Sequence, residues 1–232
     1  MSASWRAFYE KTAECCPRYR LDEDPSERLR VYVALQLIPA NLGSFLDVGC
    51  GDGALCQELG AARLKPFVGC DIASRRLEYA RRKVRAEFIQ AEASRLPFRD
   101  RSFDIVSLVE VVEHLDDPLQ ALREAARCSR RYVVITVPYR EVLTTLVCPK
   151  CLAEYKLNGH LQSFDEARLS QFVAKAEMAV VALRGFVEPL PRDWRGHPVG
   201  SAVNTVREKL LYPRRRHYKY LGALCQRRDV LR

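Results

Sequence analysis

Two acidic residues and a histidine lie close together in Glu110-Val-Val-Glu113-His114, and side chains of these types transfer protons or bind metals. If a helix begins at Glu110, the three side chains share one face of it, because residues three and four apart are neighbours on a helix. His114 is then the first candidate for handling a proton near a reacting group, with Glu113 beside it. His160, which follows Gly159, offers a further imidazole.

Cys148-Pro-Lys-Cys151 is a second group of candidate ligands. This spacing presents two thiolates to one zinc ion, and His160, nine residues later, could be a third ligand. A structural zinc site normally has four ligands, and the sequence has no second pair of this kind. His160 cannot serve two distant sites, so the sequence leaves a zinc site, an active-site metal and no metal as alternatives.

A glycine-rich segment carries the clearest binding signal. Residues 45–55 read Phe-Leu-Asp-Val-Gly-Cys-Gly-Asp-Gly-Ala-Leu. Glycines at every second position let the backbone turn sharply and lie against a ligand with no Cβ between. Between a strand and a helix they form a nucleotide-type loop, and the spacing also fits the loose dinucleotide fingerprint. However, the carboxylate of Asp47 would repel a pyrophosphate and attract a cationic amino-acid group.

Alternating strands and helices must position these residues. The apolar periodicity predicts a parallel sheet with both faces covered, because its strands are continuously apolar. After residue 139 the alternation of strand and helix patterns ends, and residues 139–164 are predicted to be irregular. The predicted strands are 44–49, 65–71, 86–90, 103–109, 131–137, 178–187 and 218–227, and the predicted helices are 1–20, 25–37, 53–63, 74–84, 118–128 and 165–175.

The segment at 45–55 resembles motif I of the class I S-adenosylmethionine (SAM) methyltransferases, of the methyltransferase type 11 group, and the resemblance continues to about residue 140. Asp71 follows the second strand, where a carboxylate can accept hydrogen bonds from both ribose hydroxyls. The segment 88–98 resembles the part that closes on the adenine, although Glu92 stands where the family more often has Asp. The resemblance implies SAM as cofactor, bound by Asp47, Gly49, Gly51, Gly53, Asp71, Ile72, Glu92, Ala93, Val109 and Glu110.

The resemblance also implies the fold and the reaction. We expect an α/β, Rossmann-like, seven-stranded and mostly parallel sheet with helices on both faces and the last strand antiparallel. One domain would span 1–232, with an N-terminal helical cap at 1–40 and substrate-side insertions at 140–165 and 188–216. The implied reaction moves the methyl group of SAM to a nucleophile, and a hydroxyl oxygen of a small molecule is the favoured acceptor.

A second, partial resemblance concerns a metal. Glu-x-x-Glu-His…His resembles the metal sites of the ubiquinone-biosynthesis O-methyltransferases and of the small-RNA terminal 2′-O-methyltransferases. There a divalent ion such as zinc or magnesium holds the acceptor hydroxyls and lowers their pKa. In this chain the set would be Glu110, Glu113, His114 and His160. A metal-dependent RNA 2′-O-methyltransferase and a SAM-binding protein without catalysis therefore remain alternatives to a small-molecule enzyme.

Composition sets the remaining expectations. The 232 residues carry a net charge of +9 and include nine cysteines, which read as reduced thiols. The first residues have no signal-peptide core, and the apolar stretches are strand-sized, so a cytoplasmic protein with no membrane partner is expected. The basic charge is compatible with nucleic acid, but charge alone does not favour it over a small-molecule acceptor.

Overall fold

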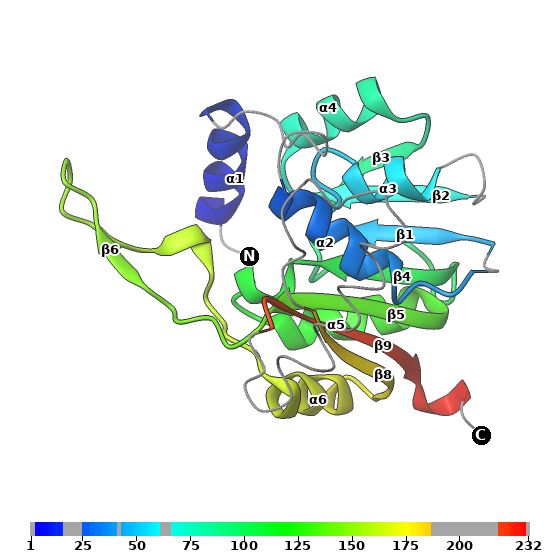
Figure 1. Cartoon of the computed structure of the whole chain (residues 1–232). Helices are drawn as coiled ribbons and strands as arrows, with labels where there is room; N and C mark the ends of the chain where they lie inside the picture. The colour runs from blue at the N-terminus through cyan, green and yellow to red at the C-terminus, as the bar shows by residue number, and fades with distance from the viewer. Residues whose placement is uncertain (1–2, 16–24, 41–42, 61–65, 187–217, 231–232) are drawn as a thin grey trace, which may run out of the picture.

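The computed structural model describes residues 3–15, 25–40, 43–60, 66–186 and 218–230. A seven-stranded sheet of order β3-β2-β1-β4-β5-β9-β8 forms its centre (Figure 1). Its strands are β1 (Phe45–Val48), β2 (Phe67–Asp71), β3 (Glu87–Gln90), β4 (Phe103–Val109), β5 (Ser129–Pro138), β8 (Met178–Phe186) and β9 (Tyr220–Arg227).

Strand direction fixes where ligands can bind. Strands β1 to β5 pair in parallel, whereas β9 lies between β5 and β8 and is antiparallel to both. The prediction of seven strands with the last one antiparallel is therefore confirmed. The strand order reverses beside β1, which pairs with β2 on one side and β4 on the other. The crevice at the carboxyl ends of strands at such a point is where open α/β sheets bind ligands.

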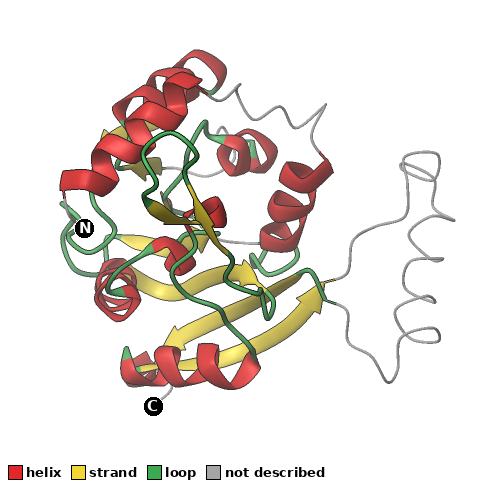
Figure 2. Ribbon diagram, turned by 90° about the vertical axis from the view of Figure 1, so that its left-hand side faces the viewer, coloured by secondary structure: helices red, strands yellow, loops and turns green. Residues whose placement is uncertain are grey.

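Helices cover both faces of the sheet, as predicted, and Figure 2 shows them on either side. Leu29, Leu55 and Leu77 of α2, α3 and α4 belong to one buried apolar cluster, and Leu122 and Leu169 of α5 and α6 belong to the other. The helices are α1 (Ala3–Cys15), α2 (Pro25–Leu35), α3 (Ala54–Leu59), α4 (Ser74–Lys83), α5 (Pro118–Cys128) and α6 (Glu166–Lys175).

Helix α1 is attached to the carboxyl edge of the sheet. The Glu10 carboxylate accepts hydrogen bonds from the backbone N–H groups of Ser74 (2.7 Å) and Arg75 (3.2 Å) at the start of α4. These N–H groups have no partner within their own helix, and an anion is favourable there. The ring of Tyr9 meets the ring of His114 edge-on, with centroids 5.9 Å apart. One side of α1 therefore faces the candidate site.

The segment 140–165 is more regular than its sequence suggests. Strands β6 (Thr145–Val147) and β7 (Glu154–Lys156) form an antiparallel hairpin, which is a sheet of its own. This hairpin extends away from the body of the molecule (Figure 1). The other predicted insertion, 188–216, lies outside the described residues. Among the described residues no helix has the length and apolar character needed to span a membrane.

Candidate active site

The three glycines of the loop after β1 serve different purposes. All have positive φ, at 73°, 52° and 79° for Gly49, Gly51 and Gly53. A Cβ on Gly49 would lie 2.4 Å from the Val111 side chain, and a Cβ on Gly53 would lie 3.2 Å from Ala80. A Cβ on Gly51 would meet no atom within 4 Å. Gly53 therefore allows close helix packing, whereas Gly51 leaves space for a ligand beside the backbone.

Asp71 fixes this loop against the end of β2. Its carboxylate accepts hydrogen bonds from the backbone N–H groups of Gly51 (2.9 Å) and Ala73 (2.8 Å). Burial raises the pKa of Asp71, and the two backbone hydrogen bonds oppose this shift. Because each carboxylate oxygen can accept more than one hydrogen bond, both oxygens retain capacity for ligand hydroxyls.

Asp47 places a second carboxylate under the loop. It is 3% exposed and accepts a hydrogen bond from the Ser107 hydroxyl at 2.6 Å. Burial raises its pKa to about 7, although the Ser107 hydrogen bond acts in the opposite direction. A cationic ligand nearby would stabilise the ionised form of such a buried acid.

A pocket of about 360 Å³ lies over this edge of the sheet. Gly53 and Glu92 are the two predicted cofactor residues that do not line it, and Glu92 instead forms an ion pair with Arg6 at 3.7 Å. The other eight predicted cofactor residues line the pocket: Asp47, Gly49, Gly51, Asp71, Ile72, Ala93, Val109 and Glu110.

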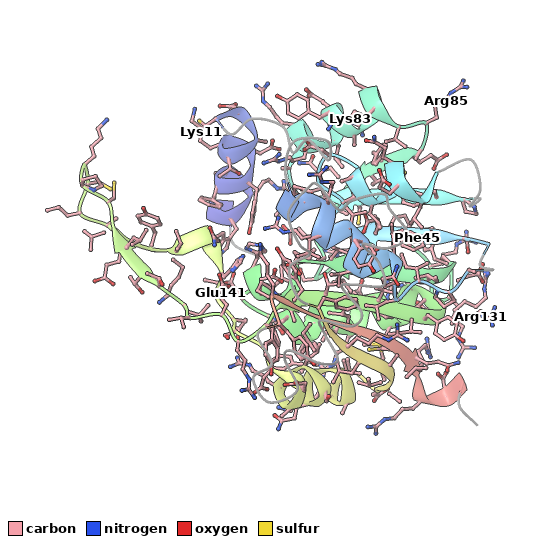
Figure 3. All side chains as sticks on the ribbon, in the orientation of Figure 1. Lys11, Phe45, Lys83, Arg85, Arg131 and Glu141 are labelled. Carbon is pink, nitrogen blue, oxygen red and sulfur yellow. The ribbon has the colours of Figure 1, made fainter. Side chains whose placement is uncertain are left out.

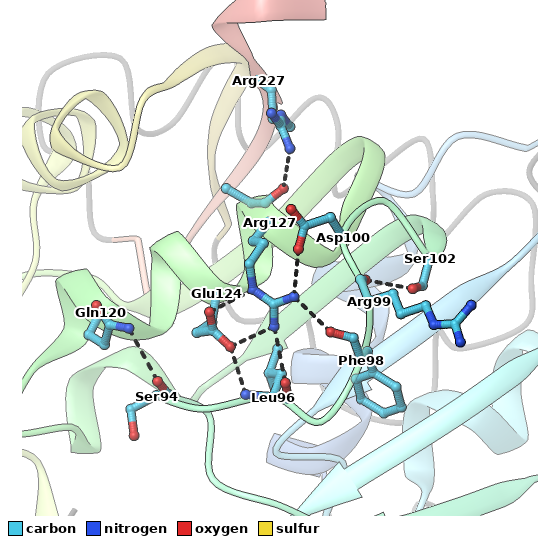
Figure 4. Close-up of polar contacts among 11 residues, drawn as sticks. Ser94, Leu96, Phe98, Arg99, Asp100, Ser102, Gln120, Glu124, Arg127 and Arg227 are labelled. Atoms are coloured by element: carbon cyan, nitrogen blue, oxygen red, sulfur yellow. Dashed lines mark hydrogen bonds and ion pairs between the residues drawn. The ribbon is translucent and has the colours of Figure 1, made fainter.

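The loop that carries Ala93 is held in place by α5 (Figure 4). The guanidinium of Arg127 donates hydrogen bonds to the backbone oxygens of Phe98 (2.7 Å) and Leu96 (3.0 Å). It also pairs with the carboxylates of Glu124 (2.8 Å) and Asp100 (2.9 Å). The loop after β3, predicted to close on an adenine, therefore has a defined position.

Glu110 does not start a helix. It follows β4 with φ of 54°, and Val112–His114 form a single 3₁₀ turn. The Glu110 carboxylate accepts a hydrogen bond from the Thr136 hydroxyl at 3.0 Å. Burial raises its pKa to about 7, and the nearby Arg30 guanidinium opposes that shift. The shared helical face considered for Glu110, Glu113 and His114 is therefore absent.

Glu113, His114 and His160 nevertheless come together. One potential ligand atom from each lies within 4.8 Å of the others, and the two imidazole centroids are 4.5 Å apart. The backbone N–H groups of Leu161 and Gln162 donate to the Glu113 carbonyl at 2.7 and 3.0 Å, which brings the two segments into register. Glu113 is fully buried, and its carboxylate oxygens have no hydrogen-bond partner among the described residues. Burial raises its pKa well above the ordinary range.

The hydrogen-bond partners assign the tautomers of both histidines. His114 Nδ1 lies 3.2 Å from the Gly159 carbonyl, which can only accept, so Nδ1 carries the proton. His160 Nδ1 bonds to the carboxylate of Glu141, where the hairpin leaves the body (Figure 3). Burial lowers the pKa of His114 to about 3, so its imidazole is neutral at pH 7. His114 Nε2 therefore keeps a lone pair, and an Nδ1 atom held by an oxygen acceptor, as in both histidines, is typical of metal-binding histidines.

Cys148 and Cys151 lie elsewhere, in the turn between β6 and β7. Hairpin pairing continues to a hydrogen bond between the Leu157 N–H and the Thr144 carbonyl. At about 3.3 Å per residue, the turn is on the order of 10 Å along the hairpin from that bond. His160 lies just beyond it, against His114, so the structure does not bring His160 to the cysteine pair.

Two residues of α2 that line the pocket were not predicted from the sequence. Arg30 donates hydrogen bonds to the Glu27 carboxylate (2.6 Å) and the Tyr220 hydroxyl (3.3 Å), and both Arg30 and Glu27 line the pocket. Polar residues at this spacing are usual on an exposed helix face. Nothing in the sequence distinguishes these two from surface charges.

A parallel sheet with this order, a glycine loop after β1 and an acid after β2 define a Rossmann-like nucleotide-binding protein. Residues 46–135 match the family described as "Methyltransferase domain". This segment of the chain therefore carries a class I SAM-dependent methyltransferase domain.

Relatives and solved structures agree with this assignment. A 27-O-demethylrifamycin SV methyltransferase from Amycolatopsis mediterranei is 31% identical over 102 residues, 40% of this chain and 38% of that protein. A mitochondrial ubiquinone biosynthesis O-methyltransferase from Schizosaccharomyces pombe is 29% identical over 177 residues, 68% and 63% of the two chains. The fold matches a SAM-dependent methyltransferase from Thermotoga maritima with a TM-score of 0.67, 17% identity and coverage of 95% and 99%. The chain thus spans from about a third to two thirds of the length of the curated relatives it matches.

Proposed function

We propose that this chain transfers the methyl group of SAM to a hydroxyl oxygen of a small-molecule acceptor. One observation carries this proposal: a single pocket is lined by Gly51 and Asp71 of the cofactor loops and by His114 and His160. Bound SAM would supply a methyl group already activated on a sulfonium. Methyl donor and proton-handling groups would therefore share one space.

The chain's own residues would bind, orient and exclude water. Asp71 would accept hydrogen bonds from the ribose, and the buried carboxylates of Asp47 and Glu110 would favour a cationic ligand over a neutral one. The neutral imidazole of His114 has a lone pair at Nε2 that could accept the proton of the acceptor hydroxyl. Holding the acceptor oxygen against the methyl carbon would account for much of the rate enhancement.

A specific observation favours a divalent ion at the same end of the pocket. Within the described part of the chain, Glu113 has two buried oxygens without hydrogen-bond partners, and His114 and His160 have their Nδ1 atoms bonded to oxygen acceptors. One carboxylate and two imidazoles are a donor set that binds zinc and other divalent metals. Such an ion would hold the acceptor hydroxyl and lower its pKa, with His114 as a ligand and no longer the base.

The names of the relatives support oxygen as the acceptor atom. Several are O-methyltransferases, including the ubiquinone-biosynthesis enzyme. The limited pocket volume favours a small acceptor over a polymer. An RNA acceptor would add phosphate contacts and a steep loss of binding with salt.

Methyl transfer from labelled SAM tests the proposal, with catechol and simple phenols as acceptor probes and a short single-stranded RNA for comparison. We expect labelled diphenol, loss of transfer with a chelator, and at least about a hundredfold lower rate in Glu113→Gln. Glu58→Gln, an exposed acid on α3, is the matched control. Transfer to RNA that falls steeply with salt would support the RNA alternative. A protein that binds SAM but methylates neither the phenols nor the RNA would contradict the proposal.

A further inference from the structure

Among the described residues, the β6–β7 hairpin lacks the support that short strands usually have. Its strands have three residues each and pair with one another in a sheet separate from the main one. Large apolar side chains on it are exposed, namely Val147 (56%), Leu152 (75%) and Tyr155 (50%). An isolated two-stranded hairpin is marginally stable in water. A cross-link or a partner is therefore expected to stabilise it.

The turn of this hairpin holds two thiols in a compact arrangement. The Cys148 N–H donates to the Ala153 carbonyl and the Leu152 N–H to the Cys148 carbonyl, both at 2.9 Å. Leu152 has φ of 58°, a conformation that a leucine rarely adopts. The Cys148 sulfur accepts hydrogen bonds from the backbone N–H groups of Cys151 and Lys150 and from the Cys151 thiol, and these lower the pKa of Cys148. The two sulfurs therefore lie on the same side of the turn.

Two thiols supply half of the ligands that a structural zinc site needs. Zinc binds thiolates strongly, and its structural sites are four-coordinate and closed. Among the described residues, no histidine, aspartate or glutamate completes a group of three with the two sulfurs, and the group that does form is that of Glu113, His114 and His160. Cys151 is exposed and Cys148 partly so, which leaves the pair accessible from outside.

We propose that Cys148 and Cys151 of two copies of this chain bind one structural zinc ion, which joins the two hairpins at their tips. A two-fold axis through the ion would bring two identical two-thiolate sites together to give four ligands. Four thiolates on Zn²⁺ carry a net charge of −2, and Lys150 from each copy supplies the compensating charge. The exposed Val147 and Leu152 could pack across the same axis.

The position of the hairpin makes this pairing sterically accessible. It extends from the body, so two tips can meet with the bodies held apart (Figure 1). The separation also reduces repulsion between two chains that each carry a net charge of +9. Zinc binding would release the thiol protons of the four cysteines to solvent.

Zinc content and mass of the full chain, purified with a phosphine reductant and no added metal, test the proposal. Cys148→Ser should lower the zinc content by 0.5 per chain and convert a dimer to a monomer, while the thermal shift with SAM is kept. Cys151→Ser should behave in the same way. Cys15→Ser, an exposed thiol on α1, is the matched control and should change neither quantity.

Subtracting the zinc content of the variant from that of the wild type removes any ion at Glu113, His114 and His160. A loss of one zinc per chain without a change in mass would overturn the proposal in favour of a site within one chain. A dimer that reductant separates and a chelator leaves intact would indicate a disulfide instead. A wild-type chain that is monomeric and contains no more zinc than Cys148→Ser would also overturn the proposal.

Discussion

The Asp71 carboxylate accepts a hydrogen bond from the backbone N–H of Gly51 at 2.9 Å, which ties the end of β2 to the middle of the glycine loop. The same carboxylate accepts the Ala73 N–H, so it orders the chain on both sides of the pocket. A ribose bound by this carboxylate would place the rest of the cofactor along the loop. The loop conformation and cofactor binding would therefore be linked through one side chain.

The glycine loop gives a prediction that separates folding from binding. Gly51→Ala should cost about 1–2 kcal/mol of stability for the left-handed backbone, and its methyl group should occupy the space where a ligand approaches. Gly49→Ala adds a clash with Val111 and should lower the melting temperature further. Thermal melts with and without SAM measure both effects. A Gly51→Ala protein with a full SAM-induced shift would contradict the assigned loop contact.

Asp47 makes the unliganded protein sensitive to pH. Its pKa rises from the ordinary 3.8 to about 7 on folding, so the folded chain binds this proton more tightly than the unfolded chain. The free energy of unfolding should therefore fall as pH rises from about 4 to about 7 and level off above. Melting temperatures across this range test the sign. Asp47→Asn should reduce the slope of unfolding free energy against pH. An unchanged slope would show that Asp47 does not cause this pH dependence.

SAM affinity should have the opposite pH dependence. A cationic ligand stabilises the ionised form of Asp47, so binding should strengthen as pH rises from about 5.5 to about 7. Titration calorimetry in buffers of different ionisation enthalpy would measure the proton released on binding. The Asp47→Asn variant should release fewer protons when it binds SAM. Equal proton release by wild type and variant would assign the released proton to another group.

Glu113→Gln should separate stability from activity. Burial raises the pKa of Glu113 well above its ordinary range and so disfavours its ionised form, and a neutral amide of similar shape should change the melting temperature little. Methyl transfer and divalent-metal affinity should both fall strongly, since the amide is a weak metal ligand. Metal titration and rate measurements check this. A variant that keeps both functions would remove Glu113 from the site.

Glu141 is predicted to act through His160. Its carboxylate holds His160 Nδ1, and partners of this kind change metal affinity by about 10–100-fold when substituted. Glu141→Gln in a Cys148→Ser background should show such a loss in competition with a chromogenic chelator. The matched control is Glu87→Gln, at an exposed acid on β3, which should leave the metal affinity unchanged. Equal affinities in the two variants would show that Glu141 does not orient a ligand.

Local sequence patterns were sufficient for the main sheet and for most of the loops that line the pocket. Continuous apolar runs before Asp47 and Asp71 predict parallel strands that end at one edge, and the structure has them there. The same patterns overextended the helix after Gly53 to residue 63, whereas α3 ends at Leu59. Gly60, with φ of 62°, follows it in a left-handed conformation that ends the helix.

The acceptor end of the pocket was less predictable because it depends on contacts between distant segments. His160 reaches His114 through backbone hydrogen bonds to the Glu113 carbonyl, which no spacing rule describes. Glu110 leaves the expected helix because the chain turns with positive φ after β4. Arg30 enters the pocket from α2 as an ordinary helix charge.

Titration calorimetry of SAM into the full chain measures the assigned cofactor site itself. We expect one SAM site per chain, with binding at least tenfold weaker in Asp71→Ala and unchanged in Glu58→Ala. Circular dichroism of the same samples would confirm that the variants are folded. A folded wild-type chain that shows no SAM binding, or a folded Asp71→Ala chain that binds SAM as tightly as wild type, would contradict the assigned site.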